Sequence, residues 1–92
     1  MPLPDFINEP ISVDLRISPD GQALPSSFVW RERKVAVCDV GRTWREESEG
    51  GFRTSWLVRS PHGVAYELQH DPIQGTWMLL RVWGRHDAAG EM

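Results

Sequence analysis

One histidine–aspartate pair is the nearest approach to a catalytic group in this sequence. His70 is followed directly by Asp71, and a carboxylate can orient an imidazole for general-base catalysis. Neighbouring residues on a strand point to opposite faces, so we expect the two residues to stabilise a turn instead of pairing. We therefore predict that the protein is not an enzyme and has no catalytic residue.

Metal and cofactor motifs are not found in the sequence either. The single cysteine, Cys38, and the three scattered histidines lack the paired spacing of a zinc site. The acidic cluster of Glu46, Glu47 and Glu49 lacks the glycine and carbonyl pattern of a calcium loop. We predict no metal and no cofactor. Cys38 lies in an apolar run, which predicts a buried thiol.

Tryptophan and arginine are the residue types that stand out. Five Trp occur in 92 residues, and most of them should fill the interior of a small domain. Trp is rarely buried completely, so one or two should reach the surface. A Trp beside Arg can stack on nucleic-acid bases or anchor a protein partner. Strand alternation and flanking arginines predict two binding surfaces: Trp44 with Arg42 and Arg45, and Trp30 with Arg31 and Arg33.

Composition and charge narrow the class of partner and the location. The formal net charge is −3 and the pI is near 5.5, which disfavours nucleic acid as the partner and favours protein. No apolar run approaches the ~20 residues of a transmembrane helix, so we expect no membrane association. The start of the chain lacks the features of a secretory signal, and a lone cysteine suits a reducing compartment. We predict a cytoplasmic protein.

The elements that must position these side chains are predicted to be strands. Residues 11–17, 52–59 and 64–69 alternate apolar and polar side chains with a period of two. Further strands are expected at 28–31, 34–44 and 76–83. Turn sequences occupy 18–21, 60–63 and 71–75, whereas 46–51 is expected to be a loop or hairpin tip. Residues 22–27 are expected to be irregular because Pro25 interrupts them.

Six short strands with tight turns predict an all-β fold. We expect a single antiparallel meander over residues 11–83, strongly twisted into a small, SH3-like, partly open barrel. Residues 1–10 contain three prolines and are expected to form an extended lead-in, and residues 84–92 a flexible tail. A flat sheet with one face covered by a dimer partner is the alternative.

Residues in both halves of the chain form a recognisable pattern. It comprises Phe28-Val29-Trp30-Arg31, Lys34-Val35, Val40 and Trp44-Arg45, then Trp56-Leu57-Val58, Gly63, Tyr66-Glu67-Leu68, Asp71 and residues 77–82. Residues 9–83 thereby resemble a small bacterial domain of unknown function, found alone or as a C-terminal extension of inactive Y-family polymerase relatives in translesion-repair cassettes. The resemblance implies a role near DNA repair and no known active site. The acidic segment 46–51 replaces an aromatic-rich hairpin typical of that family.

These observations predict a tryptophan-rich, non-enzymatic binding module. Its expected partner is a protein in DNA repair or in a related nucleic-acid-processing assembly. Two alternatives stay open. One is a structural domain that self-associates through a Trp-rich homo-oligomer interface, and the other binds single-stranded nucleic acid by Trp/Arg stacking.

Overall fold

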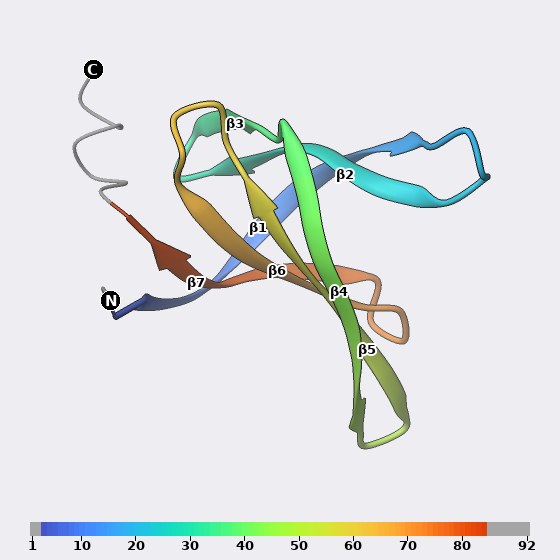
Figure 1. The fold of residues 1–92 in the computed structure, drawn as a ribbon. Helices are drawn as coiled ribbons and strands as arrows, with labels where there is room; N and C mark the ends of the chain where they lie inside the picture. Colours follow the sequence, from blue (N-terminus) through green and yellow to red (C-terminus); the bar gives the residue numbers. More distant parts are fainter. Residues whose placement is uncertain (1–2, 85–92) are drawn as a thin grey trace.

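A computed structural model describes residues 3–84, which form seven strands in one antiparallel sheet (Figure 1). The strands are β1 (Asp5–Ile17), β2 (Ala23–Trp30), β3 (Arg33–Ala36), β4 (Asp39–Ser48), β5 (Gly51–Arg59), β6 (Ala65–Asp71) and β7 (Thr76–Trp83). Their order across the sheet is β3-β2-β1-β7-β6-β5-β4. The predicted all-β class is confirmed, with seven strands where six were expected. No helix that could cross a membrane occurs within residues 3–84.

Strand β1 joins the two halves of the sheet. Residues 5–11 pair with β7, and residues 12–17 pair with β2. Residues 5–10, which we expected to be a lead-in, therefore belong to a strand. A register shift between Phe6 and Glu9 accommodates Asn8, whose φ of 54° is a left-handed value that asparagine tolerates. The first and last strands are neighbours as a result.

The additional strand arises because the predicted strand 34–44 is divided. At the division the chain changes its partner from β2 to β5: the amide of Val37 donates to the Ser26 carbonyl (3.0 Å), and that of Cys38 to the Arg59 carbonyl (2.9 Å). Cys38 is exposed in this connection, so its predicted burial is wrong. The sheet is not closed into a barrel, and the SH3-like arrangement stays a prediction.

The core lies between the two halves of the sheet and is partly aromatic. The Tyr66 ring is 5.0 Å from Phe28 and 6.4 Å from Trp30, measured between centroids, with both pairs edge-to-face. Leu68 and Leu79 are completely buried beside them. The other members of this core cluster are Val58, Val64 and Val82. Large aromatic side chains let a short chain remove enough apolar surface from water to fold.

The β1–β2 hairpin is longer than the sequence predicted. Strand β2 begins at Ala23, inside the segment expected to be irregular. Pro25 is opposite Leu15 next to a register shift, and a bulge is one of the places where a sheet accepts proline. The hairpin consequently extends past the core, and Figure 1 shows it projecting at the upper right.

The predicted turns at 18–21, 60–63 and 71–75 are confirmed. The amides of Gly21, Gly63 and Gly75 donate to the carbonyls of Ser18 (2.9 Å), Ser60 (3.0 Å) and Asp71 (2.7 Å). The expected loop at 46–51 is shorter, because β4 runs to Ser48 and leaves a two-residue tip. The expected tail lies outside the described residues beyond Gly84.

Candidate functional site

Trp30 is a core residue, so its predicted exposure is wrong. It is 8% exposed, and its indole Nε1 donates a hydrogen bond to Glu9 Oε1 at 2.9 Å. The neighbouring Arg31 places its guanidinium 4.7 Å from the centroid of the Trp30 ring. Arg31 also donates to both carboxylate oxygens of Glu9, at 3.1 Å and 2.6 Å. The arginine therefore covers the tryptophan instead of forming a platform beside it.

This Trp30–Glu9–Arg31 cluster fixes the β2–β3 turn. Hydrogen bonds from Arg31, and then from Trp30, hold the pKa of the Glu9 carboxyl below its ordinary value, although burial opposes them. Arg31 and Glu32 have φ of 51° and 65°, as the two central residues of a tight hairpin turn require. Arg33 follows as the exposed first residue of β3, opposite Trp30.

The second predicted surface is divided between two faces of the sheet. Trp44 is half-buried, with the Arg42 guanidinium 5.4 Å from its ring and its indole Nε1 donating to Glu46 Oε1 at 3.0 Å. Arg45 points to the opposite face because side chains alternate along β4. The structure thus brings Arg42 and Trp44 together but separates Arg45 from them. A binding role for these residues stays a prediction.

The face that carries Trp44, which we call the outer face, also carries buried polar groups. Gln69 donates to the Ser55 hydroxyl at 3.3 Å. Glu67 is 2% exposed and lies 3.4 Å from the guanidinium Nε of Arg81. Burial raises the pKa of the Glu67 carboxyl, and the positive charge of Arg81 opposes that rise. Strict alternation along β7 would place Arg81 on the same face as Trp77, but a register shift between Glu67 and Leu68 turns Arg81 to the outer face.

The inner face, which faces the core, ends in a row of aromatic side chains. The Trp77 centroid is 5.0 Å from that of Trp56 and 4.6 Å from that of His70, with interplanar angles of 34° and 31°. All three residues are half-buried. Thr54 and Arg45 continue the row, since Thr54 is the register partner of both His70 and Arg45. We call Trp56, His70 and Trp77 the aromatic row. The sequence did not predict it as a site, because the three residues lie on different strands and meet only in the folded sheet.

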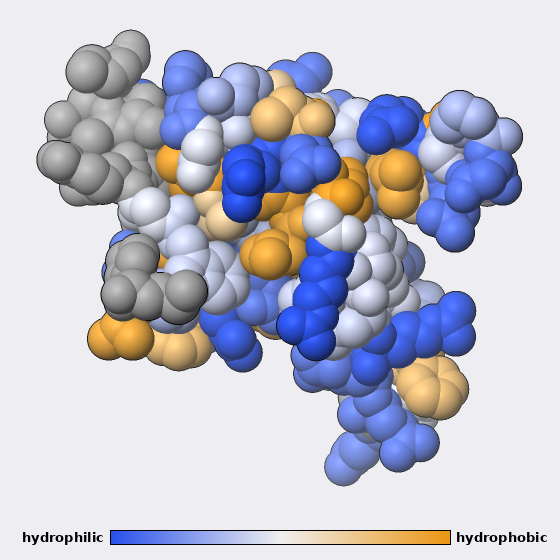
Figure 2. Space-filling model, viewed as in Figure 1, coloured by the Kyte–Doolittle hydropathy of each residue, from blue (hydrophilic) through white to orange (hydrophobic). Residues whose placement is uncertain are grey.

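Beyond the aromatic row the inner face continues along two projecting hairpins. Leu15 and Ile17 are 49% and 69% exposed. They follow the core-packed Val13 by two and four residues along β1, so their side chains lie on the same, inner side of the β1–β2 hairpin. Phe52 is 52% exposed and precedes Trp56 by four residues on β5, so its side chain also lies on the inner face. Figure 2 shows a gap at the right between the projecting hairpins. We define this opening by Leu15, Ile17, Phe52 and the aromatic row.

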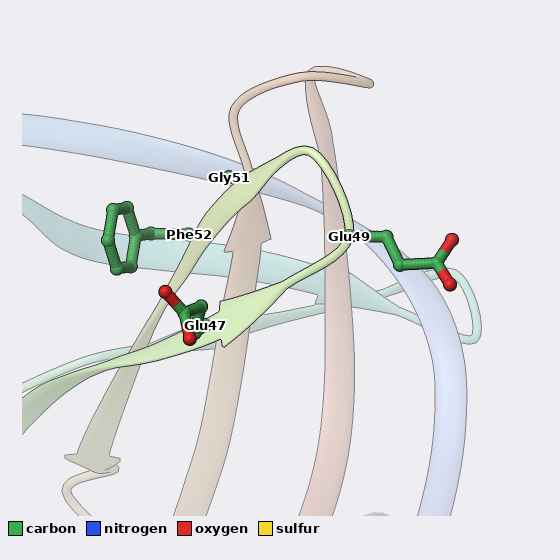
Figure 3. A pocket seen from close by; sticks show the side chains of 4 residues that line it. All are labelled: Glu47, Glu49, Gly51 and Phe52. Atoms are coloured by element: carbon green, nitrogen blue, oxygen red, sulfur yellow. The ribbon is translucent and has the colours of Figure 1, made fainter.

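A shallow hollow lies at the tip of the β4–β5 hairpin, lined by Glu47, Glu49, Gly51 and Phe52 (Figure 3). Glu47 and Phe52 are register partners and point to the same side, whereas Glu49 points away from them. The hollow therefore places one carboxylate beside the exposed aromatic ring at one end of the opening.

Asp71 stabilises the turn that follows β6, as expected. Its carboxylate accepts hydrogen bonds from the amides of Ile73 (3.0 Å) and Gln74 (3.2 Å), and it lies 3.5 Å from Arg53. The hydrogen bond from Gln74 contributes most to the lowered pKa of Asp71. His70 instead stacks on Trp77 on the other face. Within residues 3–84, no cluster of three or more His, Cys, Asp or Glu could hold a metal ion.

These features define a small all-β domain, built from one open antiparallel sheet with an apolar opening at one end. Residues 1–84 match DUF6504, described as a domain of unknown function, and the chain belongs to this family. No curated protein and no solved structure shows a significant match to the chain.

Proposed function

We propose that this protein is a non-enzymatic binding module that recognises a protein partner through the opening. The observation that carries the proposal is the exposure of Leu15 and Ile17 on a hairpin that extends beyond the core. Contiguous exposed apolar residues on a folded domain are typical of protein-interaction surfaces. The half-buried aromatic row adds the residue types that are enriched in such interfaces.

The cellular setting is part of the same proposal. The resemblance to extensions of Y-family polymerase relatives supports a partner in DNA repair or a related nucleic-acid-processing assembly, and the lone cysteine supports a cytoplasmic setting. A peptide-binding role would also suit an SH3-like curvature of the sheet, since SH3 domains bind extended segments.

Self-association is a second candidate, favoured by the same exposed residues. An apolar hairpin and an apolar opening on one chain could cover each other in a dimer with two-fold symmetry. Light scattering across a dilution series separates the two candidates, because a dimer would lose mass on dilution. Titration with single-stranded DNA at low salt tests the remaining alternative, and a flat curve would exclude it.

A pair of matched variants tests the main proposal. The domain is used as bait, captured proteins are identified, and the interaction is reconstituted from purified components and measured by calorimetry. We expect Ile17→Asp to weaken the reconstituted complex by about tenfold or more, since a charge would replace an apolar contact. Val29→Asp makes a similar change at an exposed residue on the other face of the same hairpin and should leave affinity unchanged. Equal affinity of both variants would contradict the proposal.

A further inference from the structure

The hairpin ends around the opening carry the entire net charge of the chain. Residues 14–24, 45–53 and 71–75 hold six acidic residues and three arginines, a net charge of −3 that equals the formal charge of the whole chain. The acidic residues are Asp14, Asp20, Glu46, Glu47, Glu49 and Asp71, and the arginines are Arg16, Arg45 and Arg53. The rest of the sequence has equal numbers of acidic and basic residues.

The fold gathers these three segments at one end of the molecule. A Cβ added at Gly51 would lie 3.0 Å from Ile73 Cδ1, so the β4–β5 and β6–β7 ends are in contact. Ile11 is opposite Trp77, and from there β1 continues into its hairpin at the same end as residues 71–75. In Figure 1 the β1–β2 end lies at the upper right, the β6–β7 end at the middle right and the β4–β5 end at the lower right. Arg53 pairs there with Asp71, an ion pair that takes up one charge of each sign and leaves the net charge of these segments unchanged.

The opening therefore combines an apolar floor, beside which Arg45 lies on the inner face, with hairpin ends that carry a net negative charge. Phosphate groups would be repelled by such a field, and so would the same end of a second copy. A positively charged segment would be attracted. Lysine or arginine could also stack on the half-buried tryptophans of the aromatic row.

Building on the proposed protein-binding function, we infer that the opening takes an extended segment of a partner protein in which apolar residues are flanked by lysine or arginine. The apolar side chains contact Leu15, Ile17 and the aromatic row. The basic side chains lie near Glu47 at the β4–β5 tip.

Synthetic peptides test this inference without knowledge of the natural partner. The first probe is a capped heptapeptide in which lysine alternates with isoleucine. The second replaces every lysine with glutamate, and the third replaces every isoleucine with serine. We expect calorimetry and tryptophan fluorescence to show binding of the first peptide, weakened by salt, with the other two at least about tenfold weaker.

Charge-reversal variants locate the site of binding. Glu47→Lys should weaken binding of the lysine–isoleucine peptide by about two- to fivefold, the range expected for an exposed charge interaction, and Glu49→Lys should have a smaller effect because its side chain points away from Phe52. Glu32→Lys makes the same change in the β2–β3 turn, outside the three hairpin ends, and should have no effect. All three residues are exposed, and circular dichroism with thermal unfolding verifies that each variant is folded.

Equal binding of the glutamate peptide would overturn the inference, and so would equal weakening by Glu32→Lys and Glu47→Lys. Binding of an oligo-dT strand in competition with the lysine peptide would overturn it in favour of nucleic acid. These failures are distinct from failure of the proposed function. A complex that is sensitive to Ile17→Asp but indifferent to the sign of the peptide charge would refute the inference alone.

Discussion

Glu67 and Arg81 are paired across β6 and β7 on the outer face of the sheet, with Arg81 Nε 3.4 Å from Glu67 Oε1. The two partners differ in environment, since the Glu67 side chain is 3% exposed and that of Arg81 45%. Removing a carboxylate from water is costly, and an exposed guanidinium repays that cost incompletely. Glu67 is consequently a group whose ionisation should oppose folding.

Glu67→Gln should remove the unfavourable contribution that the ionised Glu67 carboxylate makes to the stability of the folded protein. Burial raises the pKa of Glu67 in the folded protein above its ordinary value of 4.5, so the folded state binds the proton more tightly than the unfolded state. The native protein should therefore gain stability relative to Glu67→Gln as pH falls from 7 towards 4.5. Urea unfolding of both proteins at several pH values measures the difference. A difference that is constant with pH would show that Glu67 has no raised pKa.

Glu9→Gln should show the opposite pH dependence. Hydrogen bonds from Arg31 and Trp30 lower the pKa of Glu9 below its ordinary value of 4.5. The ionised carboxylate therefore stabilises the folded protein above that pH, and the contribution is lost as pH falls through the lowered pKa. In urea unfolding, the native protein should exceed Glu9→Gln in stability at neutral pH, and the gap should close in acid. A gap that widens in acid would contradict the prediction.

Substitutions to alanine should distinguish the core from the opening. Leu68 is completely buried, and Leu68→Ala should lower the free energy of unfolding by about 2–5 kcal/mol through lost burial and a cavity. Ile17→Ala should change it by no more than about 0.5 kcal/mol, because this side chain is already exposed. Chemical denaturation provides both values. A large loss with Ile17→Ala would mean that Ile17 is packed and unable to serve as a contact residue.

Glu32→Gly should stabilise the β2–β3 turn. Glu32 has a φ of 65°, which is unfavourable for a residue with a Cβ and ordinary for glycine. We expect a gain of about 0.5–1 kcal/mol in the free energy of unfolding after the greater flexibility of glycine in the unfolded chain is included. Glu32→Ala retains the Cβ and should give no such gain. Equal gains from both variants would show that the effect comes from removing the negative charge of Glu32 and not from the backbone conformation.

Period-two alternation was sufficient to predict the central strands. Val58, Tyr66 and Leu68 are buried on one face of the sheet. In the sequence these apolar residues occupy every second position of their strands, which is the spacing that puts side chains on one face. The turns were predictable for a similar reason, since glycine and proline restrict or permit backbone geometry locally. These features depend on neighbours in the sequence and on nothing distant.

Bulges account for much of what the sequence did not predict about the sheet. The shift between Glu67 and Leu68 places Arg81 on the outer face, although it follows Trp77 by an even number of residues. A second shift admits Pro25 into β2. One extra residue in a strand moves every later side chain of that strand to the other face of the sheet. The alternation of apolar and polar residues in the sequence does not show where such a bulge lies.

The candidate site depended on contacts that are distant in the sequence. Flanking arginines suggested that Trp30 is exposed, whereas Glu9, 21 residues earlier, binds the indole and holds Arg31 over it. The opposite directions of Trp44 and Arg45 could have been foreseen from alternation alone. The acidic opening could not, because its three segments come together only through the order of the strands.

The divided pairing of β1 also affects how the chain must fold. Glu9 and Leu79 are register partners 70 residues apart, so the first half of β1 cannot join the sheet until β7 is available. Pairing over such a sequence separation slows folding, because loop-closure entropy is lost before the contact is gained. During synthesis, β2 and β3 can pair as a hairpin as they leave the ribosome. Ile7 and Ile11 can join the sheet only after β7, the last strand, has been made. The first half of β1 is thus the part of the sheet whose backbone hydrogen bonds form last during synthesis.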